Sequence, residues 1–370
     1  MHDRIAGVPP SSTVLDLMAA DIAADQPLDA AERAMDNVNF YNVTLKNFAK
    51  PWTNRAMTTF VPLNDYVATV IGLVRDDSDF RTILWEDVIY VGDSALGLPA
   101  YSNSNNSHYE ALEDQNVNLR DNLVRQAQSS VTGLEAAATS GVITTRAAAQ
   151  SFFIAGTNRA MFRFTLINHL CRDLEQVHDV TLSPDRIRQD VSRSPGGDSR
   201  VFLNNCVGCH SGMDPLAQAY AYYNFDYDFD SDPEGEDGQL VYNSASETDS
   251  ETGIRVQAKY HINESNFAPG FVTPDDTWEN YWRSGINATM GWDSTLTGSG
   301  SGAKSMSREL AQSEAFAQCQ VEKVFENVCL RQPVDSADRA QVSSMLTSFQ
   351  NSGYKLKQVF AESAVYCMGD

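Results

Sequence analysis

Long hydrophobic runs are missing from this sequence of 370 residues. The apolar segments 67–74 and 152–155 are far shorter than the roughly 18 residues that cross a bilayer, so we expect no membrane span. Positive charge is scarce too, because 27 Lys and Arg face 49 Asp and Glu, which leaves a net charge of −22. Such a surface repels nucleic acid and anionic membranes. We therefore expect neither as a partner, whereas a basic protein would suit this charge.

A secretory leader is also absent from the start of the sequence, because no apolar segment follows residues 1–4. The function predicted below requires export, so we expect the leader to have been removed or left out. No internal repeat of fixed period is present, which gives no sign of a repeat architecture. A chain of this length is expected to form two or three domains, or one large domain.

The stretch 204–216 contains a pattern with specific chemistry, Cys206-Val-Gly-Cys209-His210. Cys-x-x-Cys-His is the attachment signature of c-type haem. The two-residue spacer on a helical turn places the thiols at the separation of the haem vinyl groups, and the histidine then lies under the iron as its proximal ligand. The sequence therefore predicts one covalent haem c, held by Cys206 and Cys209 and ligated by His210.

Cys-x-x-Cys also occurs in zinc knuckles and in thioredoxin-like redox sites. A zinc knuckle needs a second Cys or His pair at short spacing, but the next His is His261 and the next Cys is Cys319. A thioredoxin-like site follows a strand rich in Val and Ile, whereas residues 198–205 have the pattern of a helix. Haem is therefore favoured over both alternatives.

For the second axial ligand of the iron, our main prediction is Met290. Small monohaem cytochromes place this methionine on a loop after a helix that ends in Gly, and residues 282–290 have that form. His261 is the alternative that would give bis-His ligation, and another residue or an open site is the third. Met213 is only three residues from His210 and stays on the proximal side. An ordinary core methionine is the competing interpretation of Met290.

The haem stretch resembles the cytochrome c modules of a group of large bacterial exported proteins first noticed in planctomycetes. The resemblance lies in residues 206–216, with Met-Asp-Pro-Leu shortly after the haem histidine, and in Asn-Phe-Asp at 224–226. Residues 4–11 and the last hundred residues show weaker similarity to that group. The sequence departs from the group at Ala217, where Gly is usual, and in a long acidic insertion after Asp226. The resemblance implies an exported haem c protein and assigns no further role.

The acidic run at 226–237 places carboxylates at alternate positions, Asp226, Asp228 and Asp230. Hard oxygen ligands at every second residue resemble the start of a calcium-binding loop. The EF-hand form is not met, because its sixth position is Ser231 rather than Gly and its twelfth is Asp rather than Glu. Calcium is therefore a secondary prediction beside a solvated acidic loop.

Three arginines in the predicted helical stretch 144–171 are candidates to hold the haem propionates, because guanidinium groups pair well with carboxylates. They are Arg146, Arg159 and Arg163. On helix surfaces such arginines more often only face solvent, and that is the competing interpretation for each of them.

The four cysteines outside the haem motif are expected to form two disulfides, because haem c is attached outside the cytoplasm, where disulfides persist. Cys319 and Cys329 lie on one predicted helix about 15 Å apart along its axis, which is too far for a bridge. If the three closing helices run antiparallel, the ends that carry Cys329 and Cys367 meet. We therefore predict Cys329–Cys367 and, by elimination, Cys171–Cys319.

The apolar pattern predicts a mainly α-helical protein. A stretch rich in Ser, Pro and Gly at 186–197 suggests a boundary. We therefore expect an N-terminal helical domain over 1–185 and a monohaem cytochrome c-like helical domain, with the C-terminal helices, over 186–370. Helices are expected at 63–75, 118–127, 144–171 with a break at 156–158, 216–223, 277–283, 305–330, 336–350 and 356–367.

These predictions combine into a periplasmic or extracellular monohaem cytochrome c that transfers electrons to a redox partner protein, with oligomerisation left open. One alternative is a haem enzyme or gas-binding protein of peroxidase-like type, with an open distal site. The other is a structural subunit of an extracellular assembly, in which haem stabilises the fold.

Overall fold

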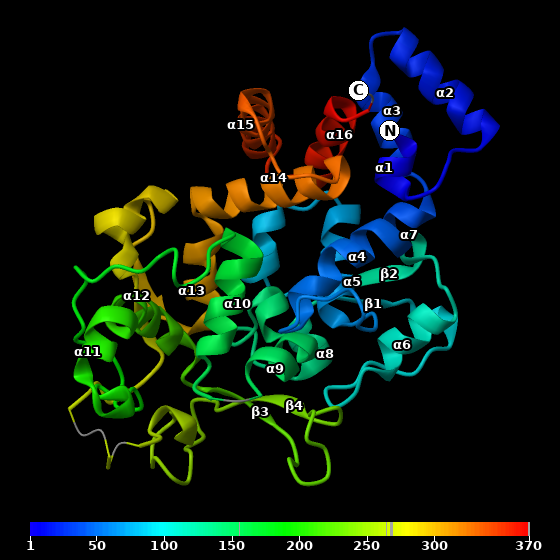
Figure 1. The fold of residues 1–370 in the computed structure, drawn as a ribbon. Coiled ribbons are helices and arrows are strands. Elements are labelled where there is room, and N and C mark those ends of the chain that lie inside the picture. Colours follow the sequence, from blue (N-terminus) through cyan, green and yellow to red (C-terminus); the bar gives the residue numbers. More distant parts are fainter. Residues whose placement is uncertain (155, 264, 267–268, 369–370) are drawn as a thin grey trace.

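The computed structural model describes residues 1–154, 156–263, 265–266 and 269–368 (Figure 1). The protein is 52% helix and 7% strand, so the prediction of a mainly α-helical fold is confirmed. The α-helices are α1 His2–Ala6, α2 Ser12–Ala23, α3 Pro27–Met35, α4 Lys46–Ala49, α5 Asp65–Arg75, α6 Ser107–Asp114, α7 Leu119–Asn122, α8 Gln128–Thr132, α9 Arg146–Phe152, α10 Arg159–Leu170, α11 Ser199–Val201, α12 Val207–Ala217, α13 Gly302–Ala311, α14 Glu314–Cys329, α15 Ser336–Asn351 and α16 Leu356–Tyr366.

In the residues that the structure describes, short strands pair into three antiparallel ribbons, each with two strands. They are β1 Ile89–Gly92 with β2 Leu123–Gln126, β3 Tyr223–Asp226 with β4 Gln239–Tyr242, and β5 Thr277–Glu279 with β6 Ser299–Ser301. Two π-helical turns lie at Phe40–Leu45 and Phe202–Cys206. The 3-10 turns are Lys50–Thr53, Phe80–Leu84, Ser94–Leu96, Gly141–Thr144, Pro195–Gly197, Gln218–Tyr220, Ala258–Tyr260, Tyr281–Arg283 and Gly285–Met290.

Side-chain caps begin several of the longer helices. Ser11, Asn64 and Ser313 each accept the backbone N–H three residues further on, at the starts of α2, α5 and α14. Such caps satisfy N–H groups that have no partner inside the helix, and they are typical of these residue types. Ser313 also explains why the predicted helix at 305–330 is two helices, because it begins α14 just after α13 ends.

Three segments predicted to be helical contain strand residues instead. Residues 118–127 form the short α7 and then β2, which pairs with the fully buried β1. Residues 277–283 form β5, which pairs with β6, and then a 3-10 turn. Residues 216–223 end in a 3-10 turn and β3. In each case a cross-strand partner from elsewhere in the chain outweighs the local helical pattern.

The hydrophobic core continues across the expected domain boundary at 185/186. One cluster of buried side chains contains Phe162 and Leu170 from α10, Leu216 from α12 and Val321 from α14. A second, smaller cluster consists of Ile187, Val191 and Phe202, with Cys206 and Val207 packed against it. The haem motif therefore lies between a main core shared by both halves and a small satellite core.

Both predicted disulfides are confirmed. Cys329–Cys367 joins the ends of α14 and α16, with Cα atoms 5.5 Å apart. Cys171–Cys319 joins the residue after α10 to α14, with Cα atoms 5.2 Å apart. The second bridge links the two halves of the chain covalently.

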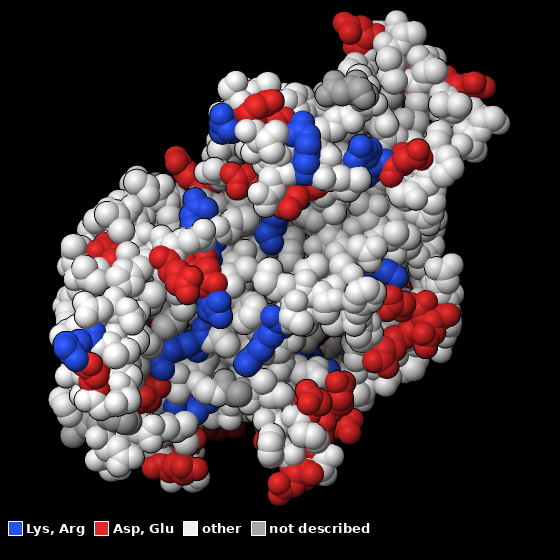
Figure 2. Space-filling view, in the orientation of Figure 1, with Lys and Arg blue, Asp and Glu red and all other residues white. Residues whose placement is uncertain are grey.

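The surface carries charge unevenly. On the face seen in Figure 2, acidic side chains gather mostly toward the outer edges, and basic side chains lie mainly nearer its middle. Within the described residues, no helix is long and apolar enough to cross a membrane.

Candidate haem-binding site

The haem motif lies where a π-helical turn passes into a regular α-helix. The turn Phe202–Cys206 is followed directly by α12. π-Helical turns are rare and occur frequently at functional sites. Cys206 and Cys209 are free thiols, and both are partly exposed, as is His210. The three predicted haem-binding side chains thus lie together on neighbouring turns, at a spacing that puts them on one side of the helix.

One side of α12 packs closely against two neighbouring rings, because two glycines on that side lack a Cβ atom. A Cβ atom added to Gly208 would lie 2.6 Å from His178 Nε2, and one added to Gly212 would lie 2.0 Å from Trp282 Nε1. Residues four apart share one face of a helix, so the two rings cover the same side. The helix is therefore closely packed on this side, whereas Cys206, Cys209 and His210 stay partly exposed.

His210 is held by Asp214, one turn further along α12. The Nδ1 atom of His210 lies 3.1 Å from Oδ1 of Asp214, whose side chain is fully buried. No described residue forms a hydrogen bond with Nε2 of His210. A metal-binding histidine commonly gives its second nitrogen to a carboxylate, which fixes the orientation and tautomer of the ring. The geometry therefore fits His210 as an iron ligand through Nε2.

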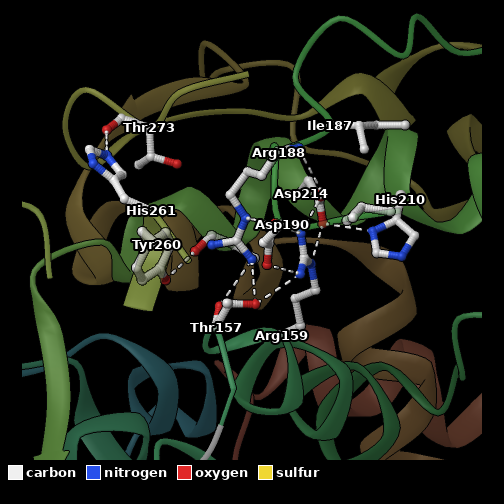
Figure 3. A network of polar contacts seen from close by, with 12 residues as sticks. Thr157, Arg159, Ile187, Arg188, Asp190, His210, Asp214, Tyr260, His261 and Thr273 are labelled. Carbon is white, nitrogen blue, oxygen red and sulfur yellow. Dashed lines mark hydrogen bonds and ion pairs between the residues drawn. The ribbon is translucent and has the colours of Figure 1, made fainter. Parts of the chain in front are cut away.

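Asp214 is part of a buried polar network that joins α10 to α12 (Figure 3). Arg159, the first residue of α10, donates from Nε to Oδ1 of Asp214 at 2.7 Å and from Nη2 to Oδ2 at 2.9 Å. The same guanidinium donates to both carboxylate oxygens of Asp190, at 2.6 and 2.9 Å. Arg188 extends the network and donates to Thr157 Oγ1 at 2.8 Å.

The network keeps both carboxyl groups ionised despite their burial. Burial alone would raise the pKa of Asp214, but the charge of Arg159 and the hydrogen bond from His210 hold that pKa well below its usual range. Burial would also raise the pKa of Asp190, and the hydrogen bond from Arg159 and the charge of Arg188 outweigh it, so this pKa is lowered too. Asp214 therefore presents a fixed negative charge to His210.

The three arginines predicted for the propionates are each engaged within the chain. Arg159 serves the network just described. Arg146 is buried and donates to the carbonyl of Gly238 at 3.1 Å. Arg163 forms a more exposed pair with Asp173, at 2.6 and 2.7 Å. None of these contacts supports the propionate assignment.

Met290, the main candidate for the second axial ligand, lies in the protein core. Its side chain is 4% exposed at the end of a 3-10 turn. It lines a cavity of about 250 Å³ together with Gln176 and Val177, and none of the haem-motif residues lines this cavity. Ligation by Met290 therefore stays a prediction.

His261, the alternative ligand, is occupied elsewhere in the structure. Its Nε2 atom lies 2.9 Å from the carbonyl oxygen of Thr273. Figure 3 shows His261 on the far side of the Asp214 network from His210. This placement gives bis-His ligation no support.

The acidic residues predicted for calcium do not converge. Asp226 ends β3, and the side chain of Asp228 accepts the backbone N–H of Asp230 at 3.1 Å. All three are exposed. In the part of the chain that the structure describes, no group of three or more His, Cys, Asp or Glu side chains is arranged to hold a metal ion. The structure thus favours the solvated loop.

Comparisons with known proteins add no assignment to this geometry. No protein-family model, curated protein or solved structure matches the chain. The site is therefore interpreted from its own residues.

The sequence alone did not identify the roles of three residues of the site, namely Asp214, Asp190 and His178. A signal for Asp214 exists, because an acidic residue four positions after a ligating histidine shares its helix face. No such signal exists for Asp190, since its contact with Arg159 spans 31 positions and depends on the fold. The same holds for His178, whose contact with α12 explains the glycine at position 208.

Proposed function

We propose that this protein is an exported monohaem c-type cytochrome that transfers electrons. Cys206 and Cys209 would hold the haem through thioether bonds, and Nε2 of His210 would bind the iron. When bound, the haem supplies a one-electron carrier. The observation that carries the proposal is the position of His210 on a helix that packs closely against neighbouring rings at Gly208 and Gly212. Its Nδ1 atom contacts Asp214, so that Nε2 is available to bind a metal.

The residues around the haem would set its reduction potential. The fixed charge of Asp214 increases the electron donation of the His210 ring, as carboxylate partners of ligating histidines do. A stronger donor favours ferric over ferrous iron. We therefore expect Asp214 to lower the reduction potential of the site.

Two features support export and a protein partner. The disulfides Cys171–Cys319 and Cys329–Cys367 are typical of proteins outside the cytoplasm, which is also where haem c is attached. The net charge of −22 favours a basic redox partner, whose association rate would fall as salt is added.

A peroxidase-like or gas-binding function is the second candidate, and the position of Met290 favours it. Met290 is 4% exposed and lines a cavity that contains none of the haem-motif residues, so its placement gives methionine ligation no support; without such a ligand, the iron would bind a small molecule. The absorption spectrum separates the two functions. Methionine ligation gives a weak band near the red end that is lost on reduction, whereas an open site gives high-spin features.

Covalent attachment is tested by producing the chain behind a secretory leader in a host that attaches haem c. After denaturation, we expect intact mass and haem staining to show one haem that acid–acetone does not extract. The double variant Cys206→Ser/Cys209→Ser should lose this haem. The matched control Cys329→Ser/Cys367→Ser should keep it. Extraction of haem from the unaltered chain would refute the proposal.

A further inference from the structure

The protein contains a further pocket, and none of the haem-motif residues lines it. It has a volume of about 720 Å³ and lies between α4 with the following 3-10 turn, the middle of α10 with the turn after it, and α14. Small-molecule sites typically have volumes of about 300–1,000 Å³. The turn after α10 lines the pocket with Arg172 and Gln176, and the carbonyl of Leu174 in this turn accepts the Cys209 thiol at 3.3 Å. The pocket is therefore a neighbour of the haem motif and separate from it.

One wall of the pocket is aromatic and preformed. Phe48, Trp52 and Phe164 line it and are 6%, 3% and 8% exposed. The rings of Phe48 and Trp52 meet edge to face, with centroids 4.8 Å apart. The backbone of Trp52 is also held, because Asn168 donates to its carbonyl at 2.9 Å. A flat apolar ring could therefore pack here without reorganising the wall.

The pocket also holds basic groups that lack carboxylate partners. Lys323 of α14 places Nζ 4.5 Å from the centroid of the Trp52 ring. Among the described residues, this ammonium group has no hydrogen bond and no ion pair. In the described part of the chain, the guanidinium groups of Arg55 and Arg172 donate to backbone carbonyls alone, at 2.7 and 3.0 Å. Burial lowers the pKa of Lys323 to about 7, because removing an ammonium from water outweighs the opposing effect of the nearby Glu326 charge.

The local charge is opposite to that of the whole protein. With Lys323 protonated, four basic residues minus two acidic residues leave the lining with a formal charge of +2, in a chain whose net charge is −22. Figure 2 likewise shows basic side chains nearer the middle of one face and acidic ones mostly at its edges. The charged lining residues are Arg55, Arg163, Arg172, Lys323, Asp173 and Glu326.

We propose that this pocket binds a small aromatic carboxylate, with its ring against the aromatic wall and its carboxylate toward Lys323 and Arg172. A small inorganic anion would gain nothing from Phe48, Trp52 and Phe164. A neutral aromatic molecule would gain nothing from the charge of Lys323, whereas a carboxylate would form an ion pair with its ammonium group. The proposal does not depend on haem.

The test uses calorimetric titration of the purified full-length protein with 2-naphthoate as the probe. We expect one saturable site, with binding about tenfold tighter than for the neutral 2-naphthamide, because a hydrogen bond to an ionised carboxylate is stronger than one to a neutral amide. Inorganic phosphate should not displace the probe. Absence of saturation at millimolar concentrations, or equal binding of both naphthalenes, would overturn the proposal, and displacement by phosphate would overturn its aromatic part.

Three variants assign the binding to the pocket. Lys323→Gln should weaken 2-naphthoate about tenfold and leave 2-naphthamide unchanged. Glu326→Gln should tighten 2-naphthoate, because it removes a negative charge from the lining, and a gain of affinity does not arise from misfolding. The matched control Lys357→Gln, which alters a lysine paired with Asp77 elsewhere, should bind as the unaltered protein does. Unchanged 2-naphthoate affinity in the first two variants would place the binding elsewhere and overturn the proposal.

Discussion

Replacing Arg159 with methionine tests the network that holds His210. The Arg159 side chain is 19% exposed and pairs with the side chains of Asp214 and Asp190, which are 0% and 5% exposed. Methionine keeps the length and apolar stem of the side chain but removes its charge and all of its donors. Both carboxylates then lose their main cation, and Arg188, 3.7 Å from Asp190, is the one that remains close.

The expected loss of stability is large for a single substitution. Removing one partner of a buried ion pair typically costs about 3–5 kcal/mol, because an uncompensated charge stays buried. Although Arg159 pairs with two carboxylates, we expect the cost of losing one ion pair rather than two, because Arg188 still lies close to Asp190. The matched control is Arg163→Met, whose pair with Asp173 has side chains 47% and 31% exposed and should contribute about 0–1 kcal/mol.

Urea unfolding at several pH values gives the measurement. The pKa of Asp190 is lowered in the folded protein, so its ion pair contributes stability above the unfolded pKa of about 3.9, and this contribution is lost as the pH falls toward the folded pKa. The free energy of unfolding of the unaltered protein should therefore exceed that of Arg159→Met most at neutral pH. The difference between the two free energies should shrink below about pH 4. A loss no larger than that of Arg163→Met, or a difference independent of pH, would refute the reasoning.

Three further predictions concern other parts of the fold. The double variant Cys171→Ser/Cys319→Ser opens a loop of 148 residues and should lose about 5 kcal/mol of unfolding free energy, as measured by urea unfolding without reductant. Gly212→Ala should lower stability by about 1–3 kcal/mol and change the tryptophan fluorescence, because its Cβ would lie 2.0 Å from Trp282 Nε1; unchanged fluorescence would contradict this contact. Met290→Ala should convert the haem to a high-spin spectrum and lower its potential if Met290 binds the iron; an unchanged low-spin spectrum would identify another ligand.

The features predicted correctly depend on local pattern or on simple distance arguments. The break at 156–158 follows from Gly and Asn in an otherwise helical stretch, and α9 and α10 end and begin beside it. The disulfide pairing follows from two steps: two cysteines ten residues apart on a continuous helix cannot meet, and antiparallel closing helices bring the ends that carry Cys329 and Cys367 together. Because α14 is continuous from Glu314 to Cys329, that exclusion holds.

The features that could not be predicted depend on partners far away in the chain. The segment 123–126 has a helical pattern but becomes β2, because the buried β1 offers it a ladder of hydrogen bonds. The carboxylate of Asp190 lies in a stretch whose Ser, Pro and Gly content predicts only a loop. Its role appears once α10 brings Arg159 beside it.

The break before α10 explains why the candidate site needs both halves of the chain. Asn158 adopts a left-handed conformation with φ of 62°, which asparagine tolerates better than most residues. Its side-chain amide donates to two backbone carbonyls just beyond α12, at 3.1 and 2.9 Å. Arg159 follows directly and reaches Asp214 inside α12. Two consecutive residues of the N-terminal half thus bind the segment that follows the motif helix and Asp214, the partner of His210. A chain that began at residue 186 would leave Asp214 without its main counter-ion, so the haem motif and the helices before it form one structural unit.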